Sequence, residues 1–272
     1  MQLINIFDQN YIPPDDLANR SKYTIPVLKK KKWDGITFFV DDSITEVSIC
    51  DSKIKIALLN EPRAIKPNIY QTIETLSKEF DYIFTFDDYL LKNVSNSVFC
   101  PYGRTWIKEK NHKIYEKNKL VNIVVSYKKW TFGHKLRHQI IKKYNYIEAF
   151  GKGINNFDKK EDVCIDYMFQ IVVENSSVKN YFTEKILDCF ATGTIPIYWG
   201  CKNIGDFFDK NGILDFKNFT ELDLILNKIN KDVYFNMIPY IERNLKTALQ
   251  YMNGEDWMVK NIKQINWEIN TK

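Results

Sequence analysis

The residues best suited to chemistry lie in one stretch, 169–200, which reads FQIVVENSSVKNYFTEKILDCFATGTIPIYWG. Its pattern predicts a strand, a polar loop, a helix and a second strand. Thr183 stands at the expected N-cap of the helix, and Gly193 stands just past its end. The loop 174–181 is therefore expected over a helix N-terminus at the carboxyl end of a parallel strand. Unpaired N–H groups and the helix dipole favour phosphorylated ligands at such a place.

Two side chains in the first turn of this helix suit a nucleotide. Lys185 offers a compact positive charge for a diphosphate, and the carboxylate of Glu184 can accept hydrogen bonds from the hydroxyl groups of a ribose. The same two residues also fit an ordinary capped helix with a solvated Glu and Lys. Spacing alone leaves both interpretations open.

The stretch resembles the signature of glycosyltransferase family 10, the α1,3/α1,4-fucosyltransferases. The residues that carry the resemblance are Glu174-Asn175-Ser176, Tyr181, Thr183-Glu184-Lys185, Gly193 and Pro196 through Gly200. The resemblance implies the GT-B fold, two Rossmann-like domains facing each other across a cleft. It also implies inverting, metal-independent transfer of fucose from GDP-fucose to a sugar hydroxyl, with no cofactor beyond the donor. By position it implies that the donor is bound by Asn175, Tyr181, Thr183, Glu184 and Lys185.

A second segment, 124–140, reads VVSYKKWTFGHKLRHQI and fits the same family less specifically. Arg137 stands where the family places a phosphate-binding arginine, and a guanidinium suits a departing diphosphate. Together with Lys185 it is implied as a catalytic group; the alternative is an exposed helix arginine. His134 and His138 are interpreted as surface or packing residues. The aromatic residues Tyr127, Trp130 and Phe132 are candidates for contact with a sugar or base, or for the core.

A third segment supplies the candidate base. ALLNEPRAIKP (57–67) followed by FDYIFTFDDYL (80–90) resembles the acceptor-side segment of the family, and Glu61 matches its general base. Glu61 follows a predicted strand and precedes Pro62, so it would project from a carboxyl end of the sheet. The alternative is a solvated loop Glu, with Arg63 as an ion-pair partner or a substrate contact.

Several observations argue against a metal site. Glycosyltransferases that use a metal commonly carry Asp-x-Asp, and this sequence has none. Its 3 His and 5 Cys are too scattered for a His-rich or Cys-rich centre, and the Cys are expected as reduced thiols. The prediction is therefore that no metal is bound and that Arg137 and Lys185 carry the charge of the leaving diphosphate.

Apolar runs separated by helical patterns predict an α/β fold with two domains, 1–115 on the acceptor side and 116–272 binding the GDP-sugar. The polar stretch Lys108–Lys119 is the expected linker, and the last helix is allowed to pack back on the first domain. The strands are expected at Leu3–Phe7, Ile36–Val40, Ile54–Leu59, Tyr82–Phe86, Leu120–Ser126, Tyr146–Phe150, Phe169–Val173 and Ile195–Trp199. The helices are expected at Pro67–Phe80, Gly133–Lys143, Thr183–Ala191, Thr220–Ile229, Val233–Tyr251 and Glu255–Ile269.

The charge of the chain excludes one class of partner. The net charge is +5, from 39 Lys and Arg against 34 Asp and Glu, and it is spread over both halves, so no nucleic-acid partner is expected. The run Lys29–Lys32 is interpreted as a solvated turn, with contact to an anionic membrane or polymer as the alternative. No signal peptide or membrane-spanning stretch is recognised, which predicts a cytoplasmic protein, soluble or peripherally bound to a membrane. The Lys-, Asn- and Ile-rich usage fits a bacterial or viral source.

Taken together, these features predict an enzyme, a hexosyltransferase similar to α1,3-fucosyltransferases. Its partners would be GDP-fucose and an oligosaccharide acceptor. Two alternatives stay open. One is the same fold and mechanism with another GDP-deoxyhexose or GDP-hexose donor, and the other is a non-catalytic protein that binds a nucleotide sugar or glycan.

Overall fold

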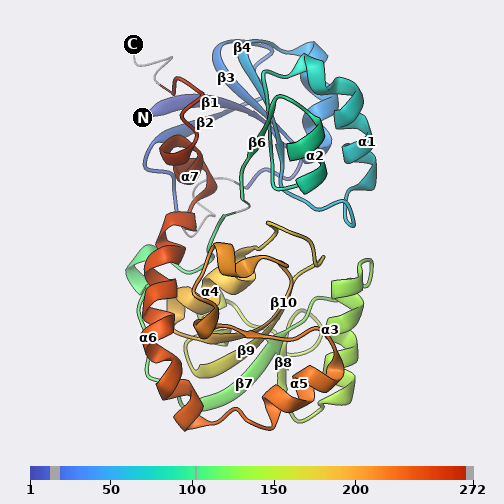
Figure 1. Ribbon diagram of the computed structural model, residues 1–272. Helices are drawn as coiled ribbons and strands as arrows, with labels where there is room; N and C mark the ends of the chain where they lie inside the picture. Colours follow the sequence, from blue (N-terminus) through green and yellow to red (C-terminus); the bar gives the residue numbers. More distant parts are fainter. Residues whose placement is uncertain (13–18, 102, 268–272) are drawn as a thin grey trace. The chain divides into compact units, whose positions relative to one another are not determined.

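The computed structural model describes residues 1–12, 19–101 and 103–267, and the chain divides into two units (Figure 1). The first unit comprises Met1–Tyr102 and Asn253–Lys272, and the second comprises Gly103–Met252. Each unit is built on its own parallel sheet. Parallel strands need crossover connections that run over the faces of the sheet, which explains why their sequences are apolar on both sides.

The first sheet has the strand order β2-β1-β3-β4-β5-β6, with every neighbouring pair parallel. The strands are β1 (Gln2–Phe7), β2 (Thr24–Leu28), β3 (Lys32–Val40), β4 (Asp51–Leu59), β5 (Tyr82–Thr85) and β6 (Ser97–Phe99). The helices of this unit are α1 (Pro67–Leu76), α2 (Asp88–Asn93) and α7 (Gly254–Asn261), with a 3-10 stretch at Asp41–Ile49.

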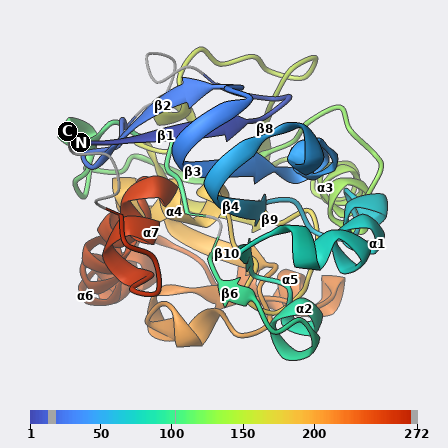
Figure 2. The same cartoon turned by 90° about the horizontal axis from the view of Figure 1, so that it is seen from above.

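Different helices cover the two faces of the first sheet. Phe39 of β3 packs in a cluster with Ile69 and Ile73 of α1, whereas its neighbour Phe38 packs in a cluster with Met258 of α7. Successive strand residues point to opposite faces, so α1 and α7 must lie on opposite sides of the sheet. Figure 2 shows this arrangement. The last segment of the chain thereby completes the core that the first segment begins.

The second sheet has the strand order β11-β10-β9-β7-β8, again with parallel neighbours. The strands are β7 (Lys119–Val124), β8 (Glu148–Phe150), β9 (Tyr167–Val173), β10 (Ile195–Trp199) and β11 (Leu214–Asp215). The helices are α3 (Phe132–Lys143), α4 (Glu184–Thr192), α5 (Phe219–Leu226) and α6 (Lys231–Ala248).

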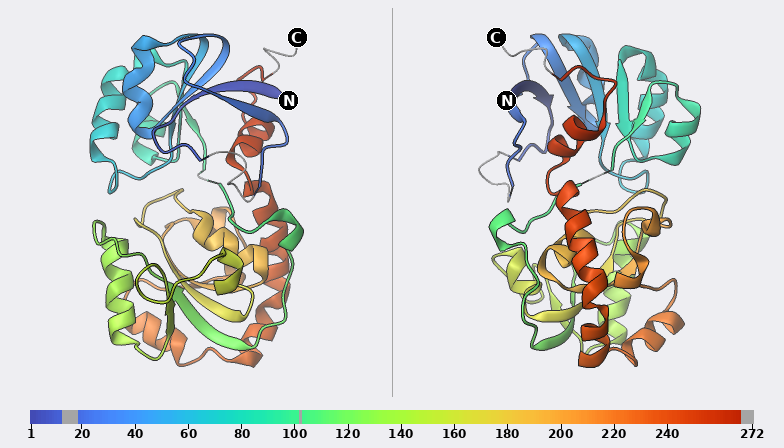
Figure 3. Two further views of the ribbon diagram at one scale, coloured as in Figure 1. Left: turned by 180° about the vertical axis from the view of Figure 1, so that it is seen from behind. Right: turned by 60° about the vertical axis from the view of Figure 1, so that its left-hand side comes forward.

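The strand order of the second sheet changes direction between β7 and β9. From β7 the chain passes through α3 to β8 on one side, and from β9 it passes through α4 to β10 on the other. Right-handed crossovers then place α3 and α4 on opposite faces. Figure 3 shows α3 and α6, the latter packed with α4, on opposite sides of this sheet. The N-termini of α3 and α4 meet at the carboxyl ends of β7 and β9, the switch point at which α/β folds bind ligands.

The segment Lys108–Lys119, expected as a linker, instead packs on the second unit. The backbone N–H of Lys113 donates to the carbonyl of Ala191 at 3.1 Å, and the Lys117 ammonium is buried, donating to the carbonyl of Cys164 at 2.9 Å. The segment is therefore held on the second unit by backbone hydrogen bonds and by the buried Lys117, although most of its polar side chains are exposed. The chain divides between 102 and 103, whereas the sequence analysis placed the boundary between 115 and 116.

Within the described residues, no helix has the length and apolar character needed to cross a membrane.

Candidate active site

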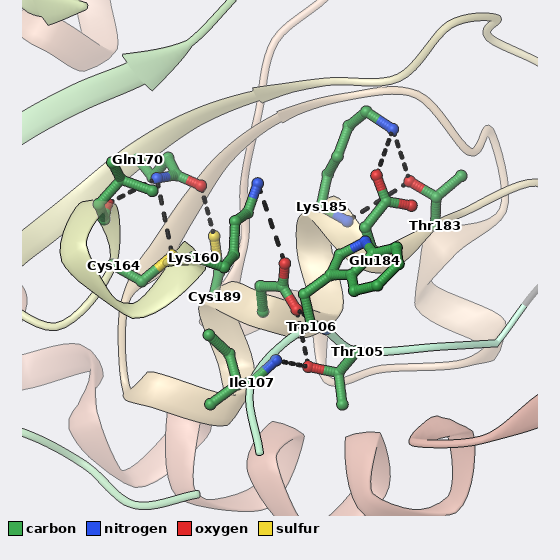
Figure 4. A network of polar contacts seen from close by, with 12 residues as sticks. Thr105, Trp106, Ile107, Lys160, Cys164, Gln170, Thr183, Glu184, Lys185 and Cys189 are labelled. Atoms are coloured by element: carbon green, nitrogen blue, oxygen red, sulfur yellow. Dashed lines mark hydrogen bonds and ion pairs between the residues drawn. The ribbon is translucent and has the colours of Figure 1, made fainter. Parts of the chain in front are cut away.

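The start of α4 brings three of the predicted residues together. Lys185 Nζ donates to Thr183 Oγ1 at 2.9 Å and to Glu184 Oε1 at 3.0 Å. Figure 4 shows the three side chains pointing toward one another at the first turn of the helix. Thr183 is the N-cap, and its Oγ1 accepts the backbone N–H of Lys185 at 3.4 Å. The ammonium is therefore fixed beside the N-terminus of the helix, where a phosphate is electrostatically favoured.

A fourth residue, Glu174, supports this turn from the end of β9. Its side chain is fully buried, and its two carboxylate oxygens accept the Thr183 N–H at 2.9 Å and the Thr183 hydroxyl at 2.8 Å. Lys185 Nζ lies 3.5 Å from Glu174 Oε2. In the sequence Glu174 stands out only as part of the family motif. In the structure its carboxylate holds the N-cap residue Thr183, a contact that the sequence does not predict.

The charges in this turn are coupled. Burial raises the pKa of Glu174. Burial also opposes ionisation of Glu184, but Lys185 and Lys160 outweigh it and bring the pKa of Glu184 down to about 2. For Lys185, burial lowers the pKa, and the carboxylates of Glu184 and Glu174 more than offset this, so its pKa is raised. Lys185 is therefore a persistent cation at neutral pH.

One turn further along α4, Asp188 anchors the segment that enters the second unit. It is fully buried, and its Oδ1 accepts the Thr105 hydroxyl at 2.7 Å and the Trp106 N–H at 2.8 Å. Lys160 Nζ lies 3.9 Å from the other oxygen. Burial raises the pKa of Asp188 to about 6. This network ties α4 to Thr105 and Trp106 and explains why that segment belongs to the second unit.

Arg137 reaches the same site from α3. Its Nε and one Nη donate to the carbonyl of Val173 at 2.9 and 2.7 Å, and the same Nη donates to Asn175 Oδ1 at 2.8 Å. Arg137 is only 4% exposed, and burial lowers its pKa. The alternative interpretation as an exposed helix arginine is therefore wrong. In this arrangement the guanidinium holds the end of β9 and orients Asn175.

The N-terminus of α3 is in close backbone contact with Glu174, the residue after β9 whose side chain holds the N-cap of α4. A Cβ added to Gly133, in the first turn of α3, would lie 1.8 Å from the carbonyl oxygen of Glu174. Only glycine fits at this approach. The contact places the start of α3 beside the loop after β9, at the switch point of the sheet.

The loop 174–181 is held in one conformation by the loop that follows β10. Asn180 has a left-handed backbone (φ 64°), its N–H donates to Asn203 Oδ1 at 2.7 Å, and Asn203 Nδ2 donates to Asn180 Oδ1 at 2.8 Å. The Ser177 hydroxyl donates to the carbonyl of Gly200 at 2.8 Å. Tyr181 is only 2% exposed, so its side chain packs inside the unit.

Three aromatic side chains are exposed on the loop between β7 and α3 and at the first residue of α3. Tyr127, Trp130 and Phe132 are 66%, 70% and 65% exposed, so they are not core residues. Phe132 stacks on Trp199 at the end of β10, with ring centroids 5.3 Å apart. Exposed aromatic side chains therefore lie close to the carboxyl end of β10 and at the start of α3.

Glu61 belongs to the first unit, where it follows β4, and it is half-buried. Its N–H and that of Asn60 donate to Asp41 Oδ1 at 3.3 and 2.9 Å. The Tyr70 hydroxyl donates to the carbonyl of Glu61 at 2.7 Å. Arg63, considered as an ion-pair partner of Glu61, instead pairs with Asp87 through two hydrogen bonds of 2.8 and 3.0 Å.

Asp41 is a residue that the sequence analysis missed. It follows β3 and has a left-handed backbone (φ 44°), which is uncommon outside glycine. Burial raises its pKa to about 7, helped by the nearby carboxylates of Glu61 and Asp8 and opposed by the two N–H groups that it accepts. Its position directly after a strand could have marked it as a candidate in the sequence. Its surroundings could not be predicted, because they are formed by Asn60 and Glu61 after β4.

Among the residues that the structure describes, no three His, Cys, Asp or Glu side chains are placed to hold a metal ion.

Comparison with known proteins identifies the family of the chain. The model of "Glycosyltransferase family 10 (fucosyltransferase) C-term" matches residues 114–252, about half of the chain. An α-(1,3)-fucosyltransferase of Helicobacter pylori is 30% identical over 111 residues, which cover 39% of this chain and 22% of that protein. A putative fucosyltransferase of Acanthamoeba polyphaga mimivirus is 28% identical over 177 residues, covering 51% and 28%. The chain thus matches less than a third of the length of these relatives.

Solved structures share the fold across nearly the whole chain. A crystal structure of an α1,3-fucosyltransferase with GDP superposes with a TM-score of 0.55 at 16% identity, covering 99% of this chain and 92% of that one. Another, of an α1,3-fucosyltransferase, has a TM-score of 0.57 at 17% identity and covers 92% and 88%. The predicted fold class, α/β with two Rossmann-like domains, is confirmed.

Proposed function

This chain belongs to glycosyltransferase family 10, and we propose that it transfers fucose from GDP-fucose to a hydroxyl group of a glycan acceptor. The observation that carries the proposal is the turn Thr183-Glu184-Lys185, held by Glu174 at a helix N-terminus on the switch point of the second sheet. The second unit would be the donor domain and the first unit the acceptor domain.

Each donor-site residue has a role that its surroundings support. Lys185 and the N–H groups at the start of α4 bind the diphosphate, because a cation and a helix dipole act together there. Glu184 is ionised and accepts hydrogen bonds from the ribose hydroxyls. Arg137 adds positive charge and positions Asn175. Tyr181, which is buried, supports the loop that carries Asn175.

The proposed reaction inverts the anomeric centre in one displacement. The carboxylate of Glu61 takes the proton of the acceptor hydroxyl, and the oxygen forms a bond to the anomeric carbon of fucose. The bond between that carbon and the β-phosphate oxygen breaks, and GDP leaves with the electron pair. The positive charges of Lys185 and Arg137 stabilise the developing diphosphate, which is the task a metal performs in other glycosyltransferases.

Calorimetric titration of GDP into the Lys185→Ala variant tests the donor site. Loss of a charge-assisted contact is expected to weaken GDP binding by about tenfold or more. Lys179→Ala is the matched control, since Lys179 lies exposed in the preceding loop, and its GDP affinity should equal that of the wild type. Equal affinity of the Lys185→Ala variant and the wild type would remove Lys185 from the site.

A further inference from the structure

His134 is buried at the N-terminus of α3, with one ring nitrogen used inside the protein. It is the third residue of the helix and only 4% exposed. Its Nδ1 accepts the backbone N–H of Thr131 at 3.3 Å and lies 2.9 Å from Thr131 Oγ1. An Nδ1 that accepts an N–H carries no proton, so the neutral ring has its proton on Nε2. No residue in the described part of the chain accepts a hydrogen bond from that Nε2.

The imidazole ring of His134 is neutral at pH 7 and lies near several positively charged side chains. Burial, Arg137, Lys128, Lys185 and His138 lower its pKa to about 4. These groups come from three elements: the loop after β7, α3 itself and α4. Two carboxylates of the site, Glu174 after β9 and Glu184 in α4, both pair with Lys185.

We propose that His134 is a donor-binding residue, which donates its Nε2–H to the diphosphate of the nucleotide. The inference rests on the proposed function, because it takes the switch point to be the nucleotide site. Three features point there: an N–H without a protein partner on a side chain that is almost fully buried, a twelve-residue helix whose dipole favours an anion at that end, and the positive charge of Lys185 on α4, which is near enough to lower the pKa of His134. The close contact of Gly133 with Glu174 joins the two helix ends.

This assignment changes the interpretation of the second segment. The resemblance implies a phosphate contact at Arg137, and the sequence alone favours a surface or packing role for His134. In the structure Arg137 directs its Nε and one Nη at Val173 and Asn175. His134, one turn closer to the N-terminus of α3, is almost fully buried and has an Nε2–H that no described residue accepts. His138 Nε2 is also buried without a partner, but it lies one turn further from the end of the helix that favours an anion.

Nuclear magnetic resonance of the full chain labelled with ¹⁵N-histidine tests the proposal. The sequence has 3 histidines, His112, His134 and His138, so signals can be assigned from single substitutions. Saturating GDP should slow the exchange of the His134 Nε2–H proton, shift its signal downfield and leave His112 unchanged. Guanosine, which lacks the diphosphate, should leave the His134 signal unchanged. GDP that saturates the protein without moving the His134 signal would overturn the proposal.

Two substitutions separate a hydrogen-bond donor from a helix cap. His134→Gln and His134→Glu both preserve the capping box with Thr131, because Gln and Glu are the usual partners at that position. Gln keeps an N–H donor and should change the GDP dissociation constant by threefold or less, whereas Glu should weaken GDP binding by about tenfold or more. Lys135→Glu, on the exposed face of the same turn, controls for added negative charge and should have a smaller effect.

The outcomes distinguish this proposal from the one on which it rests. Wild-type protein that fails to bind GDP contradicts both. Wild-type protein that binds GDP, with equal losses for His134→Glu and Lys135→Glu, keeps the nucleotide site and overturns the role of His134.

Discussion

At the scale of single residues, buried charge decides both binding and pH dependence. The site in the second unit places Lys185 among three oxygens, those of Thr183, Glu184 and Glu174, within 3.5 Å. The carboxylates of Glu184 and Glu174 keep the lysine charged, and all three contacts fix its ammonium in place before a ligand arrives. Such preorganisation lowers the entropic cost of binding a ligand.

Asp41 in the first unit gives a pH-dependent prediction. Its pKa is about 7 in the folded protein against an ordinary 3.8. Between these values the folded chain retains a proton that the unfolded chain has released, so stability falls as the pH rises from about 4 to about 7. Asn keeps an acceptor for Asn60 and Glu61 and tolerates the left-handed backbone. The unfolding temperature of Asp41→Asn should exceed that of the wild type at pH 8, on the order of 5 °C.

Near pH 4 the two unfolding temperatures should converge, because Asp41 is then uncharged in the folded wild type. Asp41→Ala is the control: it loses the acceptor of two N–H groups and should be less stable than Asp41→Asn at both pH values. If the difference in unfolding temperature between Asp41→Asn and the wild type stays constant from pH 4 to pH 8, ionisation of Asp41 is not its cause.

At the scale of elements, the site depends on how α3 and α4 approach each other. Gly133 allows the first turn of α3 to touch the carbonyl of Glu174, and Arg137 ties the same helix to the end of β9. Both contacts are made by residues far apart in the sequence, and together they fix the loop that carries Asn175.

Gly133→Ala tests this approach. The added methyl group would lie 1.8 Å from a backbone oxygen, so α3 or the loop must move. We expect a loss of about 2 kcal/mol or more in unfolding free energy and weaker GDP binding, read by thermal unfolding and calorimetry. Gln139→Ala, at an exposed position of the same helix, should be neutral in both assays. Wild-type GDP affinity in Gly133→Ala would show that the approach of the helices does not matter for the site.

The sequence predicted those features whose cause is local. The cap at Thr183, the first turn of α4 and the glycine after its end follow from spacing within one helix. Short or edge elements, such as β2 and α2, were missed because their sequences are neither long nor strongly periodic. The burial of Glu174 and His134 and the half-buried position of Asp41 could not be predicted either, since they depend on contacts between separate strands and helices.

At the scale of the whole molecule, the two units share one chain but have separate cores. The first core needs residues from both ends of the sequence: Met258, Ile262 and Ile265 cover the face of the sheet that includes Phe38 and Phe84. The polar stretch 108–119 belongs to the second unit through backbone hydrogen bonds that composition does not reveal. The division of the chain into two units is therefore set by packing between segments that are far apart in the sequence.

Ile262→Asp tests the assignment of the last segment to the first unit. Ile262 is 2% exposed within that core, so an aspartate there should destabilise the first unit by about 3 kcal/mol or more. GDP affinity, which is assigned to the second unit, should stay at the wild-type value at temperatures where both units are folded. Lys263→Asp, at the adjacent exposed position, is the control. A large loss of GDP affinity in Ile262→Asp with both units folded would contradict the assignment.

The most direct measurement of the central claim is fucose transfer by the purified protein in the presence of EDTA. GDP release would be followed with a panel of GDP-sugars and a mixed set of β-galactoside and N-acetylglucosamine acceptors. The account predicts release from GDP-fucose that requires an acceptor, persists in EDTA and is lost in Glu61→Gln, while that variant still binds GDP. Release only from another GDP-sugar, or release that stops in EDTA and returns with Mg²⁺ or Mn²⁺, would contradict it.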